Sequence, residues 1–243
     1  YCTRSFRIYL VPSAPGLQDQ VYVSNLGAVF DGGKEKIPLV VLSRFRAKGR
    51  PGEELVGEPF FQNLGYRTVR SPYFFEGEAD IKSIAPGVYV GAAGMRTSSE
   101  ALKWIADVAS IQVIECSINN PYLYHLDCLL FRLSSSEVAV VTSVVDQTTL
   151  KAIERHANIL DVPLEVGLSG ATNCIRGNEE ILCDENTSLM KSNDPLYERE
   201  ISKIRFLEHI AKKRNIAIKF FRTSEFIKSG AALSCMFMRL NNI

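Results

Sequence analysis

The chain repeats one supersecondary pattern along its length, and this repetition limits the possible folds more than any other feature. Each repeat begins with a polar loop and continues through a short apolar strand, a turn and, in four of five cases, a second strand. A single unit of this kind cannot bury its own apolar face, so neighbouring units must pack on one another. The five repeats occupy residues 19–43, 74–91, 124–143, 170–185 and 229–240.

Helical spacing of apolar residues follows the first four repeats. Residues 97–100 read Thr-Ser-Ser-Glu, which is the spacing of a capping box, and they precede an apolar stripe over 101–108. The same spacing recurs over 150–160 and 197–211, whereas 53–64 is a weaker helix because a glycine and a proline interrupt it. Hairpins that alternate with helices predict the α/β class.

Polar residues stand at corresponding loop positions in all five repeats. If the units are arranged about an axis, these side chains converge at one end of it, as they do at the strand ends of barrel folds. We therefore expect a five-fold pseudosymmetric α/β propeller of ββαβ units in one catalytic domain, residues 1–243; the alternative is a plain α/β sheet with scattered polar loops. The positions are Asn25, Glu76 to Asp80, His125 to Asp127, Asn173 and Cys235.

The last repeat is incomplete, because it lacks a second strand and a helix. A closed ring would take these from a segment ahead of Tyr1. We expect roughly forty to fifty residues there, the size of one such unit.

Three kinds of side chain at these positions suit nucleophilic attack on a cationic carbon. Cys235 stands in the small-residue loop 229–236, just before the apolar stretch 236–240, which is predicted to be a strand. His125 and Asp127 are predicted to point to one face of another strand, because side chains alternate along a strand. A thiolate is the nucleophile, an imidazole moves protons, and carboxylates hold a planar cation through charge-assisted hydrogen bonds.

Composition excludes several classes of function. The chain has 28 basic and 27 acidic side chains and no basic stripe interleaved with aromatic residues, so nucleic acid is not an expected partner. No apolar run approaches the ~20 residues of a membrane span. The six cysteines form no CxxC pair and do not cluster with the three histidines, so we expect no metal and no cofactor, in a reducing cytoplasmic setting. Homo-oligomerisation stays open.

Six motifs, in order and spacing, resemble those of the guanidino-group-modifying enzymes of the pentein superfamily. These enzymes include arginine deiminases, arginine dihydrolases, dimethylarginine dimethylaminohydrolases and amidinotransferases. The resemblance covers the chain from about residue 18 onward and implies a five-bladed α/β propeller with a central site. The motifs are DQVYVSN (19–25), GRPGEE (49–54), FEGEAD (75–80), GMRT (94–97), HLD (125–127) and SGAALSCM (229–236).

Carried over position by position, the resemblance implies that Cys235 is the nucleophile and His125 the general acid and base. Glu76 and Asp127 would grip the guanidinium group of the substrate. Asp80 would either support this pair or contact the substrate directly.

The resemblance also implies how the rest of the substrate is recognised. Arg50 and Arg96 fall where the family places the arginines that bind the α-carboxylate. Asn25 stands where deiminases and dimethylaminohydrolases usually carry Asp, and in this respect the chain resembles the arginine dihydrolases.

The implied activity is hydrolysis of C–N bonds in the guanidino group of free arginine or a close derivative, through a thiouronium on Cys235. Dimethylarginine hydrolysis ranks lower, because Asp127 would be left unpaired against two N-methyl groups. An amidinotransferase, in which an amine captures the amidino group, and a non-catalytic pentein binding module also stay open.

Overall fold

Four three-stranded sheets organise the chain, whose computed structural model describes residues 7–31 and 37–240. In each sheet an antiparallel hairpin is extended by a parallel strand that follows the intervening helix. Each sheet is therefore one ββαβ unit, as the sequence predicts, with its strands in chain order. Within the described ranges, no helix has the length and apolarity needed to cross a membrane.

The four units share this order of elements and differ mainly in the length of the helix. The first unit comprises β1 (Gly27–Phe30), β2 (Leu39–Leu42), α1 (Glu53–Asn63) and β3 (Arg67–Arg70). The second comprises β4 (Ile81–Ala85), β5 (Val88–Gly94), α2 (Ser99–Ala109) and β6 (Gln112–Ile118). The third comprises β7 (Leu130–Arg132), β8 (Glu137–Val140), α3 (Gln147–Glu154) and β9 (Asn158–Asp161). The fourth, preceded by α4 (Leu164–Leu168), comprises β10 (Ile175–Arg176), β11 (Glu180–Asp184), α5 (Pro195–Lys213) and β12 (Ala217–Phe221).

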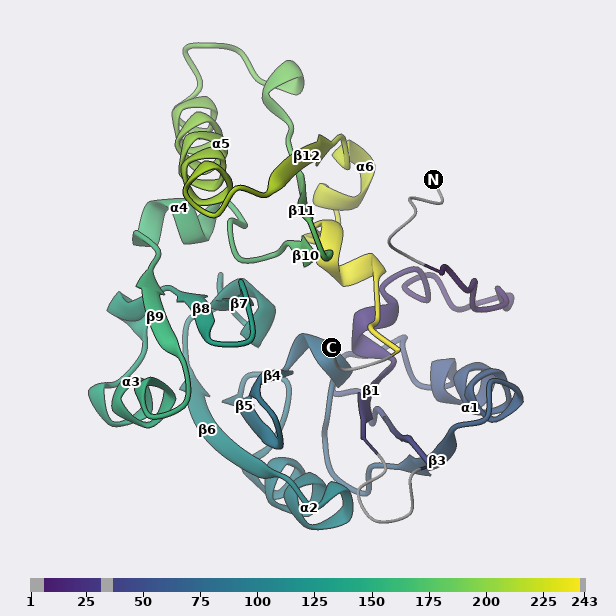
Figure 1. Ribbon diagram of the computed structural model, residues 1–243. Coiled ribbons are helices and arrows are strands. Elements are labelled where there is room, and N and C mark those ends of the chain that lie inside the picture. The colour runs from purple at the N-terminus through teal and green to yellow at the C-terminus, as the bar shows by residue number, and fades with distance from the viewer. Residues whose placement is uncertain (1–6, 32–36, 241–243) are drawn as a thin grey trace.

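The units follow one another around a common centre, with their long helices on the outside (Figure 1). The C-terminal segment, drawn in yellow, contains α6 (Ser224–Ile227) and the 3₁₀ turn η7 (Leu233–Met236) and lies between the fourth unit and the first. Three further 3₁₀ turns precede the first strands of the first three units, namely η1 (Val23–Asn25), η3 (Gly77–Ala79) and η4 (Leu126–Cys128).

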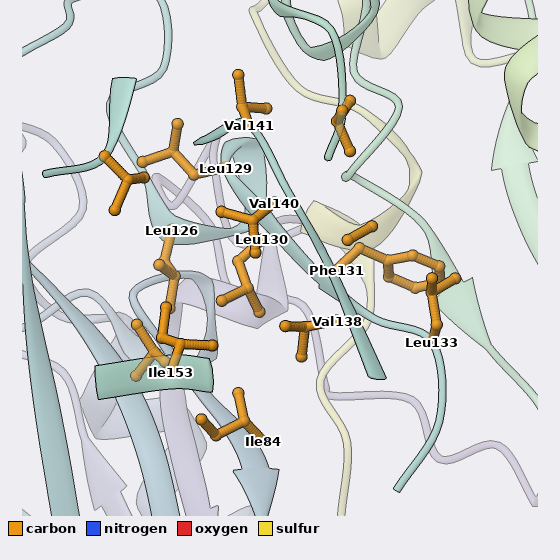
Figure 2. Close-up of a cluster of buried hydrophobic side chains, with 14 of the residues drawn as sticks. Ile84, Leu126, Leu129, Leu130, Phe131, Leu133, Val138, Val140, Val141 and Ile153 are labelled. Carbon is orange, nitrogen blue, oxygen red and sulfur yellow. The ribbon is translucent and has the colours of Figure 1, made fainter. Parts of the chain in front are cut away.

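The apolar core of the third unit holds the turn that carries His125 and Asp127. Leu126 lies between these two residues and is 1% exposed. Figure 2 shows its side chain within the buried cluster that also contains Leu130 and Val138. Burying a leucine side chain stabilises the fold by about 1.5–3 kcal/mol, so Leu126 anchors η4.

Two segments predicted as strands differ in the structure. His125 and Asp127 do not share the face of a strand, because residues 126–128 form η4 and β7 begins only at Leu130. After the turn that carries Cys235, Phe237 is extended, but residues 237–240 have no ladder partner in the described part of the chain and form no strand.

Two helix boundaries also differ from the prediction. The helix expected over 150–160 is α3, which ends at Glu154, and residues 158–161 pair with β8 as β9 instead. The cap of α2 is Ser98 rather than Thr97, since the Ser98 Oγ accepts the backbone N–H of Ala101 at 3.3 Å. The Thr97 hydroxyl has partners in the candidate site.

Gly77 lies where the first and second units meet most closely. Its φ is +68°, and a Cβ atom there would collide with the backbone of Ser24 and Asn25. Only glycine combines this left-handed backbone with so close an approach. The sequence motif FEGEAD therefore requires Gly77 for packing of η3 against η1.

We predict that Gly77→Ala lowers the free energy of unfolding by more than ~2 kcal/mol, because backbone strain and steric overlap add. The matched control is Gly87→Ala. Gly87 has a similar φ of +71°, but a Cβ atom added there would meet no other atom within 4 Å. This control should cost only about 1 kcal/mol of strain. Urea unfolding of the two variants checks the prediction, and equal losses would contradict it.

Candidate active site

The imidazole of His125 is buried against the carboxylate of Asp80. Its Nδ1 lies 2.7 Å from the Asp80 Oδ1, which also accepts the backbone N–H of Leu126 at 3.3 Å. The other oxygen, Oδ2, accepts the Thr97 hydroxyl at 2.6 Å. Asp80 thus holds His125 in place in this structure, and its role toward a substrate stays a prediction.

Three neighbouring carboxylates favour the charged imidazole. Burial is the largest single influence and lowers the pKa of His125, but the charge and hydrogen bond of Asp80, together with Asp127 and Glu76, raise the pKa of His125 above its usual value. Because Asp80 accepts a hydrogen bond, Nδ1 carries a proton in both charge states. The other nitrogen, Nε2, is therefore the end that can exchange protons with a ligand.

Nε2 of His125 faces two other predicted site residues. The Asn25 Nδ2 lies 3.3 Å from it and also 3.4 Å from the Glu76 carbonyl oxygen, to which it donates. The Glu76 Oε2 lies 3.6 Å from it. Residues from the first, second and third units thus meet at one imidazole nitrogen, as the ring of units predicts.

Glu76 is fully buried and held by donors on both of its oxygens. The backbone N–H groups of Arg46 and Ala47 donate to Oε1 at 3.1 and 3.2 Å, and the Arg96 Nη1 donates to Oε2 at 3.3 Å. The backbone N–H of Glu76 donates to the Thr97 Oγ1 at 3.0 Å. Thr97 therefore links Glu76 to Asp80, which fixes two carboxylates relative to each other.

Asp127 is held from the C-terminal segment. The Ser234 Oγ donates to its Oδ2 at 3.1 Å, and the Cys128 Sγ lies 3.6 Å from its Oδ1. Burial raises the pKa of Asp127, an effect that Lys82, His125 and the Ser234 hydroxyl oppose. A cation bound beside Asp127 would relieve the desolvation of this carboxylate.

The thiol of Cys235, the predicted nucleophile, is carried by the C-terminal segment. Burial, and then the Asp127 carboxylate, raise the pKa of Cys235 to about 12. The thiol is therefore protonated at neutral pH while no cation is bound. Its sulfur lies 3.7 Å from the Asn173 Nδ2.

Tyr124 joins the imidazole, the second unit and the C-terminal segment. Its ring centroid is 4.8 Å from that of His125, and the Arg96 guanidinium carbon lies over the ring at 5.0 Å. Its hydroxyl donates to the Gly230 carbonyl at 3.3 Å, at the start of the loop that leads to Cys235. Arg96 is thus placed at the edge of the cluster, with its side chain 31% exposed.

The other predicted arginine, Arg50, makes its contacts elsewhere. Its guanidinium group pairs with Glu53 at 2.7 Å, stacks over Phe45 at 4.5 Å and donates to the Tyr22 carbonyl at 3.0 Å. These contacts support the segment that leads to Asn25. A role for Arg50 in binding a carboxylate stays a prediction.

Sequence reasoning missed several residues of the cluster. The capping-box spacing predicts Thr97 as a helix cap, although its place in the GMRT motif beside Arg96 is a signal for a role in the site. Ser234 had only its position before Cys235 to indicate a role. The backbone N–H groups that hold Glu76 leave no trace in the identity of Arg46 and Ala47. In the described ranges, no group of three or more His, Cys, Asp or Glu side chains has metal-binding geometry.

Comparison with known proteins gives relatives with described activities. No protein-family model matches the chain. The chain is 30% identical over 139 residues to the N(G),N(G)-dimethylarginine dimethylaminohydrolase of Mycobacterium tuberculosis. The matched region covers 57% of this chain and 44% of that protein. The chain is 25% identical over 238 residues to ArgZ of Synechocystis, a bifunctional arginine dihydrolase/ornithine cyclodeaminase; the match covers 95% of this chain but only 30% of ArgZ.

Solved structures give the same family of neighbours. The product-bound N-terminal domain of ArgZ, an arginine dihydrolase, superimposes with a TM-score of 0.82 at 23% identity, covering 98% of this chain and 81% of that one. An asparagine-to-serine variant of that domain, covalently bound to a reaction intermediate, gives the same TM-score at 22% identity. Likeness at this identity establishes the fold, so the prediction of a pentein fold is confirmed.

We predict that Asp80→Asn lowers the pKa of His125, because the substitution keeps the shape and removes the charge that opposes burial. An NMR titration of the His125 Cε1–H checks this, with His156 and His209 as internal references. An unchanged or higher pKa would contradict the role given to Asp80.

The raised pKa of His125 in the folded protein also makes the stability depend on pH. Because the folded-state pKa of His125 lies above its unfolded value of ~6.5, the resulting stabilisation is fully present below pH ~6.5 and is lost as pH rises through the folded-state pKa. Asp80→Asn should therefore cost more free energy of unfolding at pH ~6 than at pH ~9. Urea unfolding at the two pH values measures the difference.

Proposed function

We propose that this pentein chain, whose relatives of described activity modify guanidino compounds, is a cysteine hydrolase that cleaves C–N bonds of free arginine. One observation carries the proposal. The Asp127 carboxylate acts electrostatically on both the Cys235 thiol and the His125 imidazole, while the Glu76 carboxylate, which precedes the neighbouring second unit, lies 3.6 Å from the same imidazole. A thiol and an imidazole thus lie close to two buried anions, an arrangement suited to a planar cation.

The two carboxylates would hold the guanidinium group in a fixed plane. Glu76 and Asp127 accept hydrogen bonds from its N–H groups, and charge-assisted pairs of this kind are roughly twice as strong as neutral ones. Binding also places a positive charge beside Cys235. This charge offsets the influence of Asp127 and lowers the pKa of the thiol, so that substrate binding itself prepares the nucleophile.

His125 would carry the proton through the first half of the reaction. As the Cys235 sulfur adds to the guanidinium carbon, the Nε2 of His125 accepts the thiol proton. It then gives this proton to the departing nitrogen, so that ammonia leaves and a thiouronium remains on Cys235. In the second half His125 takes a proton from water, and the resulting hydroxide adds to the same carbon. The C–S bond then breaks, the proton of the new hydroxyl group passes to the leaving sulfur to restore the thiol, and His125 releases its proton to solvent.

Asn25 bears on the number of bonds that are cut. Hydrolysis of one C–N bond yields a neutral ureido group, whose oxygen a carboxylate would repel and an amide N–H would bind. Asn25 already directs its Nδ2 toward the Nε2 of His125. We propose that the ureido product is retained and cleaved again, so that arginine gives ornithine, carbon dioxide and two ammonia molecules.

Arg96 is the group that we propose for the substrate's α-carboxylate. Its side chain is partly exposed at the edge of the cluster and is held by the Tyr124 ring and by one contact to Glu76. Most of its five donors therefore remain for a bidentate carboxylate contact. Its guanidinium group would then set the distance between the two ends of the ligand.

Dimethylarginine is the second candidate substrate, because the mycobacterial relative is a dimethylarginine dimethylaminohydrolase. We rank it lower on physical grounds. Two N-methyl groups cannot donate to the buried Asp127 carboxylate, and a buried acceptor that loses its partner costs about 1–3 kcal/mol.

We predict that the protein converts arginine to ornithine with two ammonia molecules per arginine, measured by mass spectrometry and an ammonia assay. Cys235→Ser should abolish turnover while still binding arginine in calorimetry, since the carboxylates remain. Turnover by the Cys235→Ser variant would contradict the thiouronium mechanism, and citrulline as the end product would contradict the second cleavage.

We predict also that kcat/KM is at least tenfold higher for arginine than for dimethylarginine, and that Asp127→Ser narrows this ratio. The reason is that only arginine satisfies the Asp127 carboxylate, worth about tenfold or more. A ratio that favours dimethylarginine, with release of dimethylamine, would move the assignment to the second candidate.

A further inference from the structure

Asn173 lies at the start of the fourth unit, and its side chain meets the C-terminal segment inside the protein. The residue is 3% exposed. Its Oδ1 accepts the backbone N–H of Ser234 at 2.9 Å. Because a backbone N–H can only donate, this contact fixes which end of the amide is oxygen and which is the NH₂ group.

The sulfur of Cys235 lies against both ends of this amide. Its distance is 3.7 Å to Nδ2 and 3.8 Å to Oδ1, both within hydrogen-bond range for sulfur. A thiol can donate to Oδ1, which has a second lone pair beside the one used by Ser234. A thiolate can accept from Nδ2. The amide therefore has a partner for the sulfur in either protonation state.

The charges around Cys235 make such a donor important. Asp127 on η4 is the anion that raises the pKa of Cys235, whereas Lys82 on β4 is the cation that lowers it. The Lys82 ammonium group is itself paired with Glu78 at 3.2 Å. Burial raises the pKa of two neighbouring groups, the Cys128 thiol and the Tyr124 hydroxyl, and so favours their neutral forms.

Two elements that pack on η7, namely η1, which reads Val-Ser-Asn, and β11, bring no unpaired charge to it. The acidic side chains of β11, Glu180 and Asp184, pair with lysines of the fourth unit. The anionic sulfur is thus favoured by a backbone hydrogen bond from Ala232, by the Asn173 amide and by the Lys82 charge, and of these the Asn173 amide is the side chain in direct contact with the sulfur.

We propose that Asn173 is a catalytic residue, which hydrogen-bonds the Cys235 thiolate and orients its sulfur for attack. The proposal rests on the proposed role of Cys235 as nucleophile. When the thiol proton leaves, the sulfur exchanges its contact with Oδ1 for one with the adjacent Nδ2, so it need not move. The amide then stays in place through the formation and hydrolysis of the covalent intermediate.

The test is the rate of alkylation of Cys235 by iodoacetamide as a function of pH, read by peptide mass spectrometry. Iodoacetamide is neutral and is not a guanidine, so the readout does not depend on turnover of arginine. Asn173→Ala removes the donor, and Asn173→Asp replaces it by a carboxylate that can still accept the Ser234 N–H. Asn186→Ala is the matched control, because Asn186 is also a buried asparagine of the fourth unit but contacts Asp184 and Glu200.

Above pH ~7.5 we expect alkylation to fall roughly tenfold in Asn173→Ala, since a hydrogen bond to a charged group is worth about 1.5–3 kcal/mol. The alkylation rate should fall further in Asn173→Asp and stay at the wild-type value in Asn186→Ala. In both Asn173 variants, the pH at which the alkylation rate is half-maximal should shift upward. If Asn173 only braced the loop, Asn173→Asp would keep that contact and react like the wild type, and this result would overturn the proposal. Thermal unfolding of each variant confirms that the alkylated protein is folded.

The outcomes separate this proposal from the proposed function. The expected order of alkylation rates without any turnover of arginine would support the thiolate contact and count against the arginine hydrolase. Turnover of arginine that is unchanged in Asn173→Asp, with unchanged alkylation, would overturn the role of Asn173 and leave the hydrolase standing.

Discussion

Three carboxylates buried close together repel one another and lose their hydration, and the site is organised around this cost. Glu76, Asp80 and Asp127 are each at most 1% exposed. An uncompensated buried charge is strongly destabilising, so each carboxylate needs donors or a cation. The three carboxylates have unequal sets of hydrogen-bond donors, and this difference distinguishes the roles proposed for them.

Asp80 has the fullest set of partners, because an imidazole, a hydroxyl and a backbone N–H all donate to it. Glu76 is held by two backbone N–H groups and one partly exposed arginine. Asp127 receives a serine hydroxyl and a thiol, which are weaker donors, and burial raises its pKa. Under the proposed function, a guanidinium ligand would relieve the desolvation of Asp127 that its present partners leave uncompensated, so the incomplete pairing of Asp127 supports the proposed binding of a cation.

The sequence predicted the units and their order well, because the period of the hairpins and the helical spacing are local signals. The repetition alone predicted that Asn25, Glu76, His125 and Asp127 lie close together. The sequence could not show that Thr97 turns away from its helix to join Asp80 and Glu76, since a hydroxyl serves equally well as a cap. The sequence also could not place Arg50. Its GRPGEE motif is compatible with a ligand contact and equally with the buried ion pair to Glu53 that the structure contains. Backbone donors such as the N–H groups of residues 46 and 47 are invisible to any reading of side chains.

The hydrogen bonds that complete the site join residues very far apart in the chain. Asn25 and His125 are separated by 100 positions, Asp127 and Ser234 by 107, and Tyr22 and Ser229 by 207. Contacts between residues this far apart in the sequence form late and slowly, because a long stretch of chain must close into a loop before the contact can add stability. Each ββαβ unit can form from residues that are neighbours in the sequence, whereas the cluster of site residues forms only after the first unit and the C-terminal segment have come together. The proposed catalytic activity should therefore be the last property that the chain acquires as it folds, well after its sheets have formed.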